Sequence, residues 1–215
     1  MAEACCELGA KLLDQKQVLY QTDNFFVAPT IGPIGIEGYL LIMPKKCYSG
    51  VGGIPEELYP ELENVLEKTR SVLKKEYDLD SQMFEHGPRF GKYGGGICLD
   101  HAHLHVVPGV DILERVLSDL PKRLDEVGLF FRVRLVDGFQ RVAEISQKQN
   151  SSYLMIESPN PKKGRFIFEV NFNLLSQYVR KRIGESRGTD EWDYAVFPQY
   201  GLVERTIERL KGKFD

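Results

Sequence analysis

The chain contains 215 residues, of which 42% are apolar and 27% are charged, a composition typical of a globular protein with a sizeable hydrophobic core. Its net charge of −3 excludes a general positive field that would draw it to nucleic acid or to a membrane surface. No apolar run approaches the roughly 18 residues that are needed to cross a bilayer, so we expect no association with a membrane.

In the first half of the chain, the pattern predicts short strands around one long helix. Apolar runs bounded by turn residues predict strands at 18–20, 24–28, 39–43, 82–86 and 97–107. A helix that begins at Pro55 carries Leu58, Leu62, Val65, Leu66, Val72 and Leu73 at helical spacing. A second helix is expected at 111–120. The segments 30–38 and 87–96 are rich in glycine and are predicted to be loops.

In the second half, the composition of residues 121–128 suggests a boundary, after which the pattern restarts. Strands are predicted at 130–136, 153–157 and 165–171, and helices at 139–149, 174–183 and 203–210. Helices mixed with strands that are joined mostly by hairpin-length loops indicate an α+β fold with antiparallel sheets. We expect a catalytic domain over residues 1–122 and a C-terminal α+β extension over residues 123–215 that packs against it.

The four cysteines and the N-terminal residues bear on the cellular compartment. Cys5, Cys6, Cys47 and Cys98 are too few and too irregularly spaced for a disulfide framework, which favours reduced thiols. Residues 1–15 lack the basic start and apolar run of a secretion signal. A cytoplasmic protein is therefore expected.

All four histidines of the chain lie between positions 86 and 105. Side chains alternate between the two faces of a strand, so His101, His103 and His105 are expected to form one row of roughly 13 Å. The residues between and after them, Ala102, Leu104 and Val106, would then face the core. This pattern of period two indicates a functional site.

Three interpretations of the row remain open. It could be an exposed strand face that happens to be rich in histidine, or a metal site that Glu85 or His86 completes. The third interpretation is phosphoryl or nucleotidyl transfer, in which an imidazole attacks phosphorus. The preceding Gly-rich loop favours the third, because its backbone N–H groups and its cations Arg89 and Lys92 could approach phosphate oxygens.

Four blocks of the sequence resemble the histidine triad (HIT) family. HAHLHVV resembles the family signature of three histidines alternating with apolar residues, and GYLLIMPKK, VLYQTDNFFVAP and FEHGP resemble its upstream blocks in order and spacing. The resemblance covers residues 18–110 and implies an antiparallel HIT-like sheet with flanking helices. LLSQYVRKRIGESRGTDEWDYAVFP resembles the C-terminal tail of bacterial HIT proteins related to the CwfJ-type, splicing-associated branch.

The resemblance implies a chemistry for each histidine. His103 would be the nucleophile that forms a covalent nucleotidyl-imidazole, which water then hydrolyses. His101 and His105 would hydrogen-bond the phosphate oxygens or the bridging oxygen. A third histidine, where transferases of the superfamily carry glutamine, favours hydrolysis of a nucleoside phosphoramidate, a dinucleoside polyphosphate or a related phosphoanhydride. Nucleotidyl transfer is the alternative, and no metal or other cofactor is expected.

The residues expected to hold the substrate depart from the family pattern. Tyr39 replaces a histidine that supports the first histidine of the triad, and Thr30 lies near the usual ribose-binding Asp or Asn. Cys98 is either a polar group near the leaving group or a small buried side chain. His86 would pair with Asp100 or reach the phosphate. Glu85 aligns with a substrate-binding amide, although a salt bridge to Arg89 or Lys92 is the favoured interpretation.

Basic runs in the extension leave a second function open. Residues 162–165 and 180–182 are rich in Lys and Arg, as in a solvated surface or in a rim that follows the phosphates of an RNA-derived substrate. Trp192 is expected to anchor the extension by packing. The competing hypothesis is a HIT-shaped module with weak or no catalysis that binds RNA. Many family members dimerise, so a homodimer is also considered. Cys5 and Cys6 form at most a degenerate zinc motif, and no structural zinc is expected.

Overall fold

The computed structural model describes residues 17–87, 101–127, 131–136, 138–148, 152–160, 163–170 and 177–215. These residues build one antiparallel sheet of eight strands in the order β1-β2-β3-β5-β4-β7-β8-β6. The strands are β1 (Tyr20–Gln21), β2 (Phe25–Pro29), β3 (Leu40–Pro44), β4 (Ser81–Gly87), β5 (Leu104–Pro108), β6 (Phe131–Val136), β7 (Ser152–Glu157) and β8 (Arg165–Val170). The predicted α+β class with an antiparallel sheet is confirmed.

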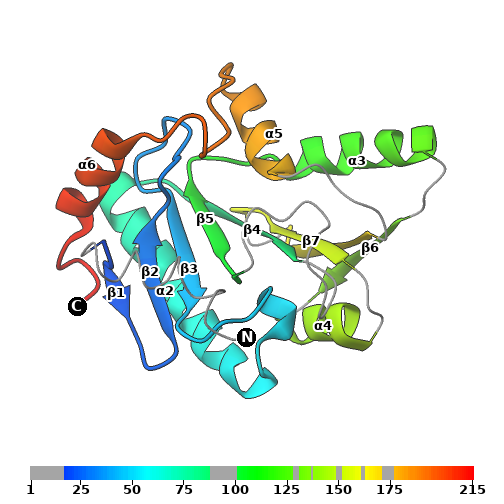
Figure 1. The fold of residues 1–215 in the computed structure, drawn as a ribbon, viewed down its shortest axis with the longest axis horizontal. Helices are drawn as coiled ribbons and strands as arrows, with labels where there is room; N and C mark the ends of the chain where they lie inside the picture. Colours follow the sequence, from blue (N-terminus) through cyan, green and yellow to red (C-terminus); the bar gives the residue numbers. More distant parts are fainter. Residues whose placement is uncertain are drawn as a thin grey trace.

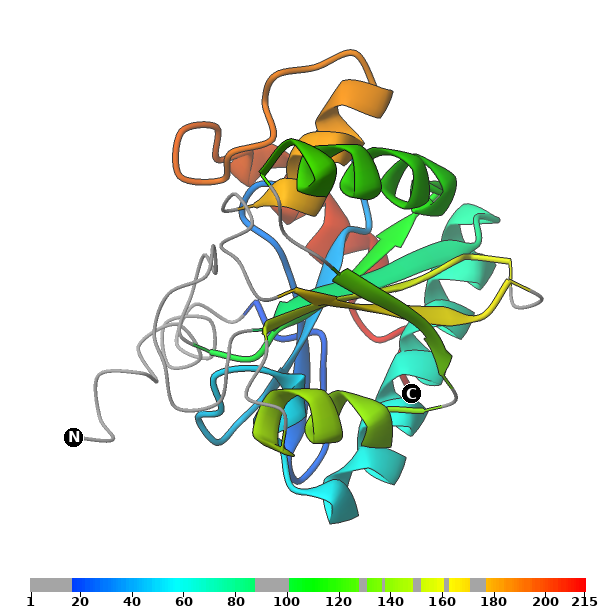
Figure 2. The same cartoon turned by 90° about the vertical axis from the view of Figure 1, so that its right-hand side faces the viewer.

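Helices cover both faces of this sheet (Figures 1 and 2). Helices α3 (Leu113–Val127) and α5 (Tyr178–Ser186) lie on one face, and α2 (Tyr59–Tyr77) and α4 (Gln140–Ala143) lie on the other. Two 3-10 turns, Val51–Gly53 and Glu56–Leu58, precede α2, and a π-helical turn, Glu144–Lys148, continues α4. Helix α6 (Tyr200–Leu210) packs beside α2 and β2. Within the described ranges, no helix has both the length and the apolar character required to cross a membrane.

Because the sheet is covered twice, its central strands contribute apolar side chains to two cores. The core on the α2 side, called the α2 core below, includes Phe25, Val27, Leu40, Ile42, Leu66, Leu104, Val106 and Met155. The core on the α3 side, called the α3 core, includes Phe26, Ala28, Tyr39, Leu41, Phe84, Val107, Val116 and Ile183. Neighbouring residues of one strand thus enter opposite cores, which explains why these strands are continuously apolar in sequence.

Helix α2 shows how local sequence sets an element. Pro60 lies in its first turn, where a missing N–H costs nothing. Its buried face contains Leu62, Val65, Leu66, Val72 and Leu73, as the helical spacing predicts. The helix ends at Asp78, which adopts a left-handed conformation (φ 54°, ψ 31°) and donates its N–H to the carbonyl of Lys74. This turn delivers the chain directly into β4.

The strand that follows the Gly-rich segment is shorter than predicted. The pattern predicts a strand from residue 97, whereas β5 begins at Leu104. The N–H of Ala102 donates to the carbonyl of Tyr48 at 2.6 Å, so it makes no ladder bond to β3 or β4. His101 and His103 therefore precede the strand, and the predicted row of three histidines on one strand is wrong in this respect.

The second half of the chain continues the sheet of the first half. β7 pairs with β4 over Met83–Gly87, and β8 and β6 follow beyond it. Helix α3 spans residue 122, where the division into a catalytic domain and an extension was predicted. That division stays a prediction. The predicted helix at 139–149 occurs as α4 with its π-helical continuation.

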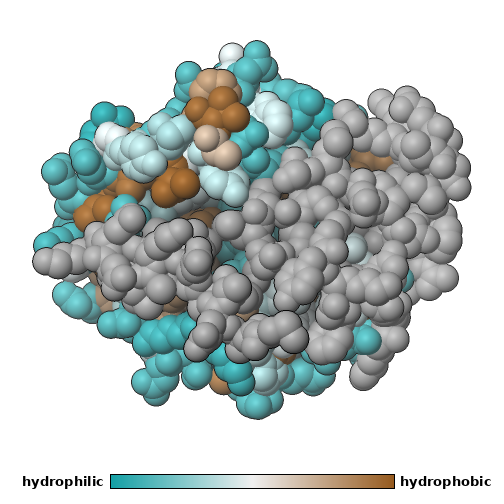
Figure 3. All heavy atoms as spheres, in the orientation of Figure 1, coloured by the Kyte–Doolittle hydropathy of each residue, from teal (hydrophilic) through white to brown (hydrophobic). Residues whose placement is uncertain are grey.

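The face of the molecule seen in Figure 3 is mainly hydrophilic where the described residues are visible, with hydrophobic side chains near α5 and α6. Three large hydrophobic side chains that are more than a third exposed belong to the segment between these helices or to the start of α6. They are Val196, Phe197 and Tyr200. Single exposed apolar residues are common on protein surfaces and indicate no function by themselves.

Candidate active site

The three histidines converge where the chain enters β5, which lies between β3 and β4. Ala102, Leu104 and Val106 are buried in the α2 core, as the alternation predicts. The ring of His105 lies on the opposite face, where it stacks on the Phe84 ring of the α3 core at 4.3 Å between centroids. The ring of His103 approaches that of His105 edge-on at 4.9 Å. The rings of His103 and His105 thus lie close together, with His105 on the α3 side of the sheet.

The protonation state of His103 follows from its partner. Its Nδ1 lies 2.7 Å from the carbonyl oxygen of His101, and a carbonyl can only accept. Nδ1 therefore carries the proton, and in the neutral ring the lone pair is on Nε2. Burial lowers the pKa of His103 below its usual 6.5, although the bond to the His101 carbonyl opposes this. The imidazole is consequently neutral at pH 7, as a nucleophile must be.

His101 supports this arrangement from the backbone side. Its Nε2 donates to the carbonyl of Pro44 at 2.7 Å, which ties the segment before β5 to the end of β3. Its own carbonyl accepts a hydrogen bond from Nδ1–H of His103. The resemblance implies a phosphate contact for His101. In the structure, Nε2 of this residue is committed to a backbone carbonyl, and the residue holds the neighbouring histidine.

Tyr39 supports the third histidine of the triad, whereas the sequence connects its position with the first. Its hydroxyl lies 2.8 Å from Nδ1 of His105. The pKa of His105 lies well below 6.5 because of burial first, and then because of the nearby His103 and Arg180. A neutral His105 with a hydrogen-bonded Nδ1 is able to use its other ring nitrogen toward a substrate.

Arg180 of α5 is the site residue that the sequence interpretation missed. The run 180–182 reads as a solvated or RNA-contacting surface, but Arg180 is only 3% exposed and its guanidinium lies against Tyr39. Arg182 is also buried and forms ion pairs with Asp119 and Glu185. These two arginines therefore form no outward rim. A sequence signal was available only in the apolar residues of the same helix, which predict that one of its faces is buried.

The other basic run is also engaged within the protein. Arg165 is buried and pairs with Glu63 at 2.8 Å and with Glu157 at 2.7 Å. Lys163 pairs with Glu114 and Asp111 at the surface. Acidic side chains thus pair with both of these described residues, and a phosphate-following rim stays a prediction. Trp192 packs against the α3 core, as expected of an anchor.

Neighbouring residues on β4 face opposite cores. The alternation of β4 places His86 on the same side of the sheet as Phe84, toward the triad. Burial lowers its pKa to about 4, and His103 adds to this shift. None of the described residues hydrogen-bonds its Nε2, and Asp100, its predicted partner, lies outside the described ranges. His86 is placed to contribute to the site.

Glu85 points to the opposite side of the sheet, which separates it from the triad. Its carboxylate accepts the N–H of Val51 at 2.6 Å and the hydroxyl of Tyr153 at 2.6 Å. Burial raises its pKa to about 7 in spite of these two bonds. The predicted contact with substrate thus has no geometric support. Its predicted partners Arg89 and Lys92 lie outside the described residues, as does Cys98.

Thr30 is the last of the predicted site residues, and Cys47 bears on the expectation of reduced thiols. Thr30 is buried and extends the β2–β3 ladder, since its N–H donates to the carbonyl of Tyr39 at 3.2 Å. Its part in binding a ribose stays a prediction. Cys47 is disulfide-bonded, so the expectation of reduced thiols is wrong for this residue. Spacing along a chain does not reveal which sulfurs approach each other in space.

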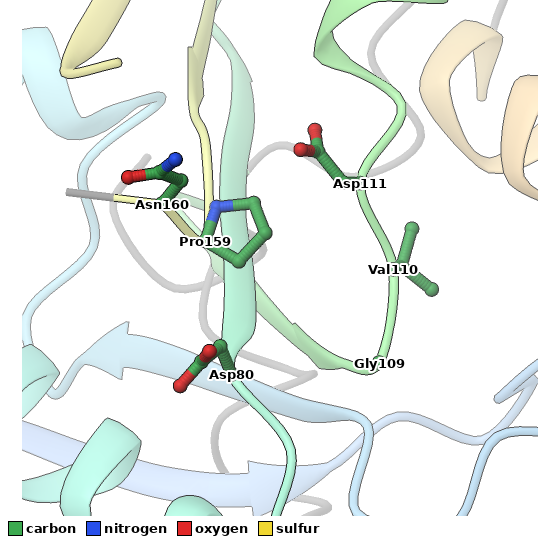
Figure 4. Close-up of a pocket in the computed structure, with 6 residues that line it drawn as sticks. All are labelled: Asp80, Gly109, Val110, Asp111, Pro159 and Asn160. Atoms are coloured by element: carbon green, nitrogen blue, oxygen red, sulfur yellow. The ribbon is translucent and has the colours of Figure 1, made fainter. Parts of the chain in front are cut away.

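The last two observations concern a possible metal site and a cavity away from the triad. Among the residues that the structure describes, no group of three or more His, Cys, Asp or Glu side chains is arranged to hold a metal ion. A cavity of about 470 Å³ lies at the end of β5 away from the histidines (Figure 4). It is lined by Asp80, Gly109, Val110, Asp111, Pro159 and Asn160. Lys74 and Lys163 pair with its two carboxylates.

Comparison with known proteins finds similarity among solved structures only. No family model and no curated protein matches the chain. A HIT-like protein from Bartonella henselae is 20% identical, with 52% of this chain and 83% of that chain covered and a TM-score of 0.41. A HIT family hydrolase from Clostridium thermocellum is 19% identical, with 52% and 96% covered and a TM-score of 0.38.

A zinc-bound histidine triad family protein from Mycobacterium smegmatis is 19% identical, with 59% of this chain and 99% of that chain covered and a TM-score of 0.39. Similarity at this level assigns neither a family nor an activity to the chain.

Proposed function

We propose that the protein hydrolyses a phosphoramidate or phosphoanhydride bond of a nucleotide through a covalent nucleotidyl-His103 intermediate. Candidate substrates are nucleoside phosphoramidates and dinucleoside polyphosphates. The observation that carries the proposal is the bond from His103 Nδ1 to the carbonyl of His101. It leaves the Nε2 lone pair of a neutral ring as the nucleophile, within a cluster of three histidines that sequence alone singles out.

In the first step, Nε2 of His103 attacks the phosphorus of the nucleotidyl group. The N–P bond forms, the bond from phosphorus to the leaving group breaks, and the leaving group departs with the electron pair and takes up a proton from solvent. The ring gains positive charge as the bond forms. The Nδ1–H donor shares this charge with the His101 carbonyl at 2.7 Å, which stabilises the intermediate.

In the second step, water attacks the same phosphorus and the N–P bond breaks. The electron pair returns to Nε2, the proton of the water passes to solvent, and His103 is again neutral with Nδ1–H in place. His105, edge-on to His103 at 4.9 Å, is close enough to donate to a phosphoryl oxygen in both steps and to the leaving group in the first. An acceptor other than water would give nucleotidyl transfer from the same intermediate.

Substitution of the nucleophile tests the proposal directly. Wild type and His103→Ala are incubated with adenosine phosphoramidate and with diadenosine polyphosphates, and the protein is denatured at neutral to alkaline pH because phosphoryl-histidine bonds are acid-labile. Intact mass spectrometry should show an added nucleotidyl mass on wild type only. We expect kcat/KM of His103→Ala to fall by about 10⁴-fold or more.

Four measurements separate the alternatives. Undiminished turnover by His103→Ala would refute the nucleophile. Product analysis in the presence of phosphate-bearing acceptors distinguishes transfer from hydrolysis. A metalloenzyme would lose activity on dialysis against a chelator and regain it with zinc or manganese, whereas we expect full activity after dialysis. Tight, steeply salt-dependent RNA binding without any turnover would favour the RNA-binding module.

A further inference from the structure

Arg180 connects the C-terminal part of the chain to the triad. It lies on α5, 141 residues after Tyr39, yet its Nη1 approaches the Tyr39 hydroxyl at 3.5 Å. Its guanidinium carbon lies 5.6 Å from the centre of the Tyr39 ring and 5.8 Å from that of Tyr194. A cation buried to this degree beside a histidine cluster requires partners that offset its desolvation.

The donors of Arg180 are nearly all occupied. Nε donates to Gln177 Oε1 at 3.0 Å and to the Trp192 carbonyl at 3.1 Å. Nη2 donates to the carbonyls of Gly32 and Trp192. The guanidinium thereby joins the loop after β2, the start of β3 and the segment after α5. Because its donors are used within the protein, Arg180 is suited to hold neighbouring groups in place and not to bind phosphate itself.

The direction of the hydrogen bonds follows from donor chemistry. Arginine can only donate, so the oxygen of the Tyr39 hydroxyl is the acceptor in its contact with Nη1. With its oxygen accepting from Arg180, the hydroxyl can direct its proton to Nδ1 of His105, 2.8 Å away. Accepting at Nδ1 leaves the proton of the neutral ring on Nε2. In this arrangement the two rings are opposite tautomers. His105 presents an N–H donor at Nε2, and His103 presents a lone pair at Nε2.

We propose that Arg180 is a positioning residue of the active site, which orients the Tyr39 hydroxyl and thereby fixes His105 as a hydrogen-bond donor to the substrate. The inference rests on the proposed function of the triad. The charge of Arg180 also favours a neutral His105, because a buried cation near His103 and His105 disfavours protonation of either ring. Helix α5 then belongs to the site as much as the triad does.

Nitrogen NMR on protein with labelled histidine tests the tautomer without reference to turnover. At pH 7, the wild-type ¹⁵N shifts of His105 should show protonated Nε2 and unprotonated Nδ1. In Arg180→Met and in Tyr39→Phe, we expect this preference to relax and the pKa of His105 to rise by about 1 unit. Arg180→Lys keeps the charge, so the pKa should stay low while the tautomer preference weakens.

Kinetics provide the second readout. We expect Arg180→Met to lower kcat/KM by about 10- to 100-fold, as is typical of lost outer-shell hydrogen bonds. If Arg180 acts through Tyr39, kcat/KM of the Arg180→Met, Tyr39→Phe double variant should be no lower than that of Tyr39→Phe alone. Independent effects of the two substitutions on kcat/KM would multiply. Arg182→Met is the matched control, since it removes a buried arginine from the same helix whose partners are Asp119 and Glu185.

The outcomes separate this inference from the proposed function. A folded Arg180→Met or Arg180→Lys protein with an unchanged His105 tautomer would overturn the inference, as would multiplicative kinetic effects. Equal changes at His105 in Arg182→Met would also overturn it, because they would report a general loss of packing. If wild type showed no turnover, the proposed function would fail while the NMR result still decided the role of Arg180.

Discussion

At the scale of single residues, Glu85 and His86 are adjacent on β4, and their pKa values are shifted in opposite directions. The two shifts make the free energy of unfolding depend on pH with opposite signs. The pKa of His86 falls to about 4 in the folded chain. The unfolded chain therefore binds the extra proton between pH 6.5 and 4, and stability is lost as the pH falls through that window. The pKa of Glu85 rises to about 7. The folded chain then keeps a proton that the unfolded chain releases, and stability is lost as the pH rises from 4.5 to 7.

Replacing Glu85 by glutamine isolates the second effect. Glu85→Gln cannot ionise, so its free energy of unfolding relative to wild type should increase between pH 4.5 and 7, by about 3 kcal/mol at most. Urea denaturation at a series of pH values measures this difference. Glu157→Gln is the control, because the Arg165 and Arg70 partners of Glu157 lower its pKa and place its effect below pH 4.5. A difference for Glu85→Gln that is independent of pH would contradict the assignment.

At the scale of elements, Gly32 shows how a loop and a helix share one space. A Cβ at position 32 would lie 2.6 Å from Tyr194 Cβ and 3.0 Å from Arg180 Nη2. We expect Gly32→Ala to destabilise the protein by about 1–3 kcal/mol and to lower activity, because the loop must move away from Tyr194 and shift the carbonyl that accepts from Arg180. Thermal unfolding and steady-state kinetics measure the two effects.

A glycine in α6 provides the comparison. A Cβ at Gly201 would meet nothing within 4 Å, so Gly201→Ala should stabilise α6 by up to about 1 kcal/mol through helix propensity and leave activity unchanged. Equal changes in Tm for the two alanine variants would show that the space around Gly32 is not restricted.

For β5, sequence predicts which way the side chains face but not where the strand begins. Leu104 and His105 face opposite sides of the sheet as predicted, because side-chain alternation is a property of the strand backbone itself. Local patterning does not predict the start of β5, because that start depends on a tertiary hydrogen bond from the Ala102 N–H to the carbonyl of Tyr48. The burial of Arg180 was missed for the same reason, since its acceptors at Gly32 and Trp192 are brought together only by the tertiary fold.

At the scale of the whole molecule, the sheet joins the two halves of the chain through β4 and β7. Met83–Gly87 pairs with Tyr153–Glu157, and Tyr178, Val179 and Ile183 of α5 complete the α3 core. A fragment that ends at residue 122 would expose both the free edge of β4 and the surface of this core. Exposed strand edges and apolar surfaces favour aggregation.

Division of the chain therefore tests the predicted domains. We expect the fragment 1–122 to aggregate or to unfold without cooperativity, and co-expression with 123–215 to restore a monodisperse complex. Size-exclusion chromatography and thermal unfolding measure both. A fragment 1–122 that unfolds cooperatively at the Tm of the whole chain would instead support an independent catalytic domain.

The distance in sequence between Tyr39 and Arg180 has a consequence for biosynthesis. The ribosome adds the triad about midway through the chain, and Arg180 follows 75 residues after His105. With the roles proposed above, a growing chain carries the imidazole of His103 well before the guanidinium of Arg180 can reach Tyr39. Activity would then be acquired late, when α5 has left the exit tunnel and docked, and truncated translation products would contain the triad in an unorganised state.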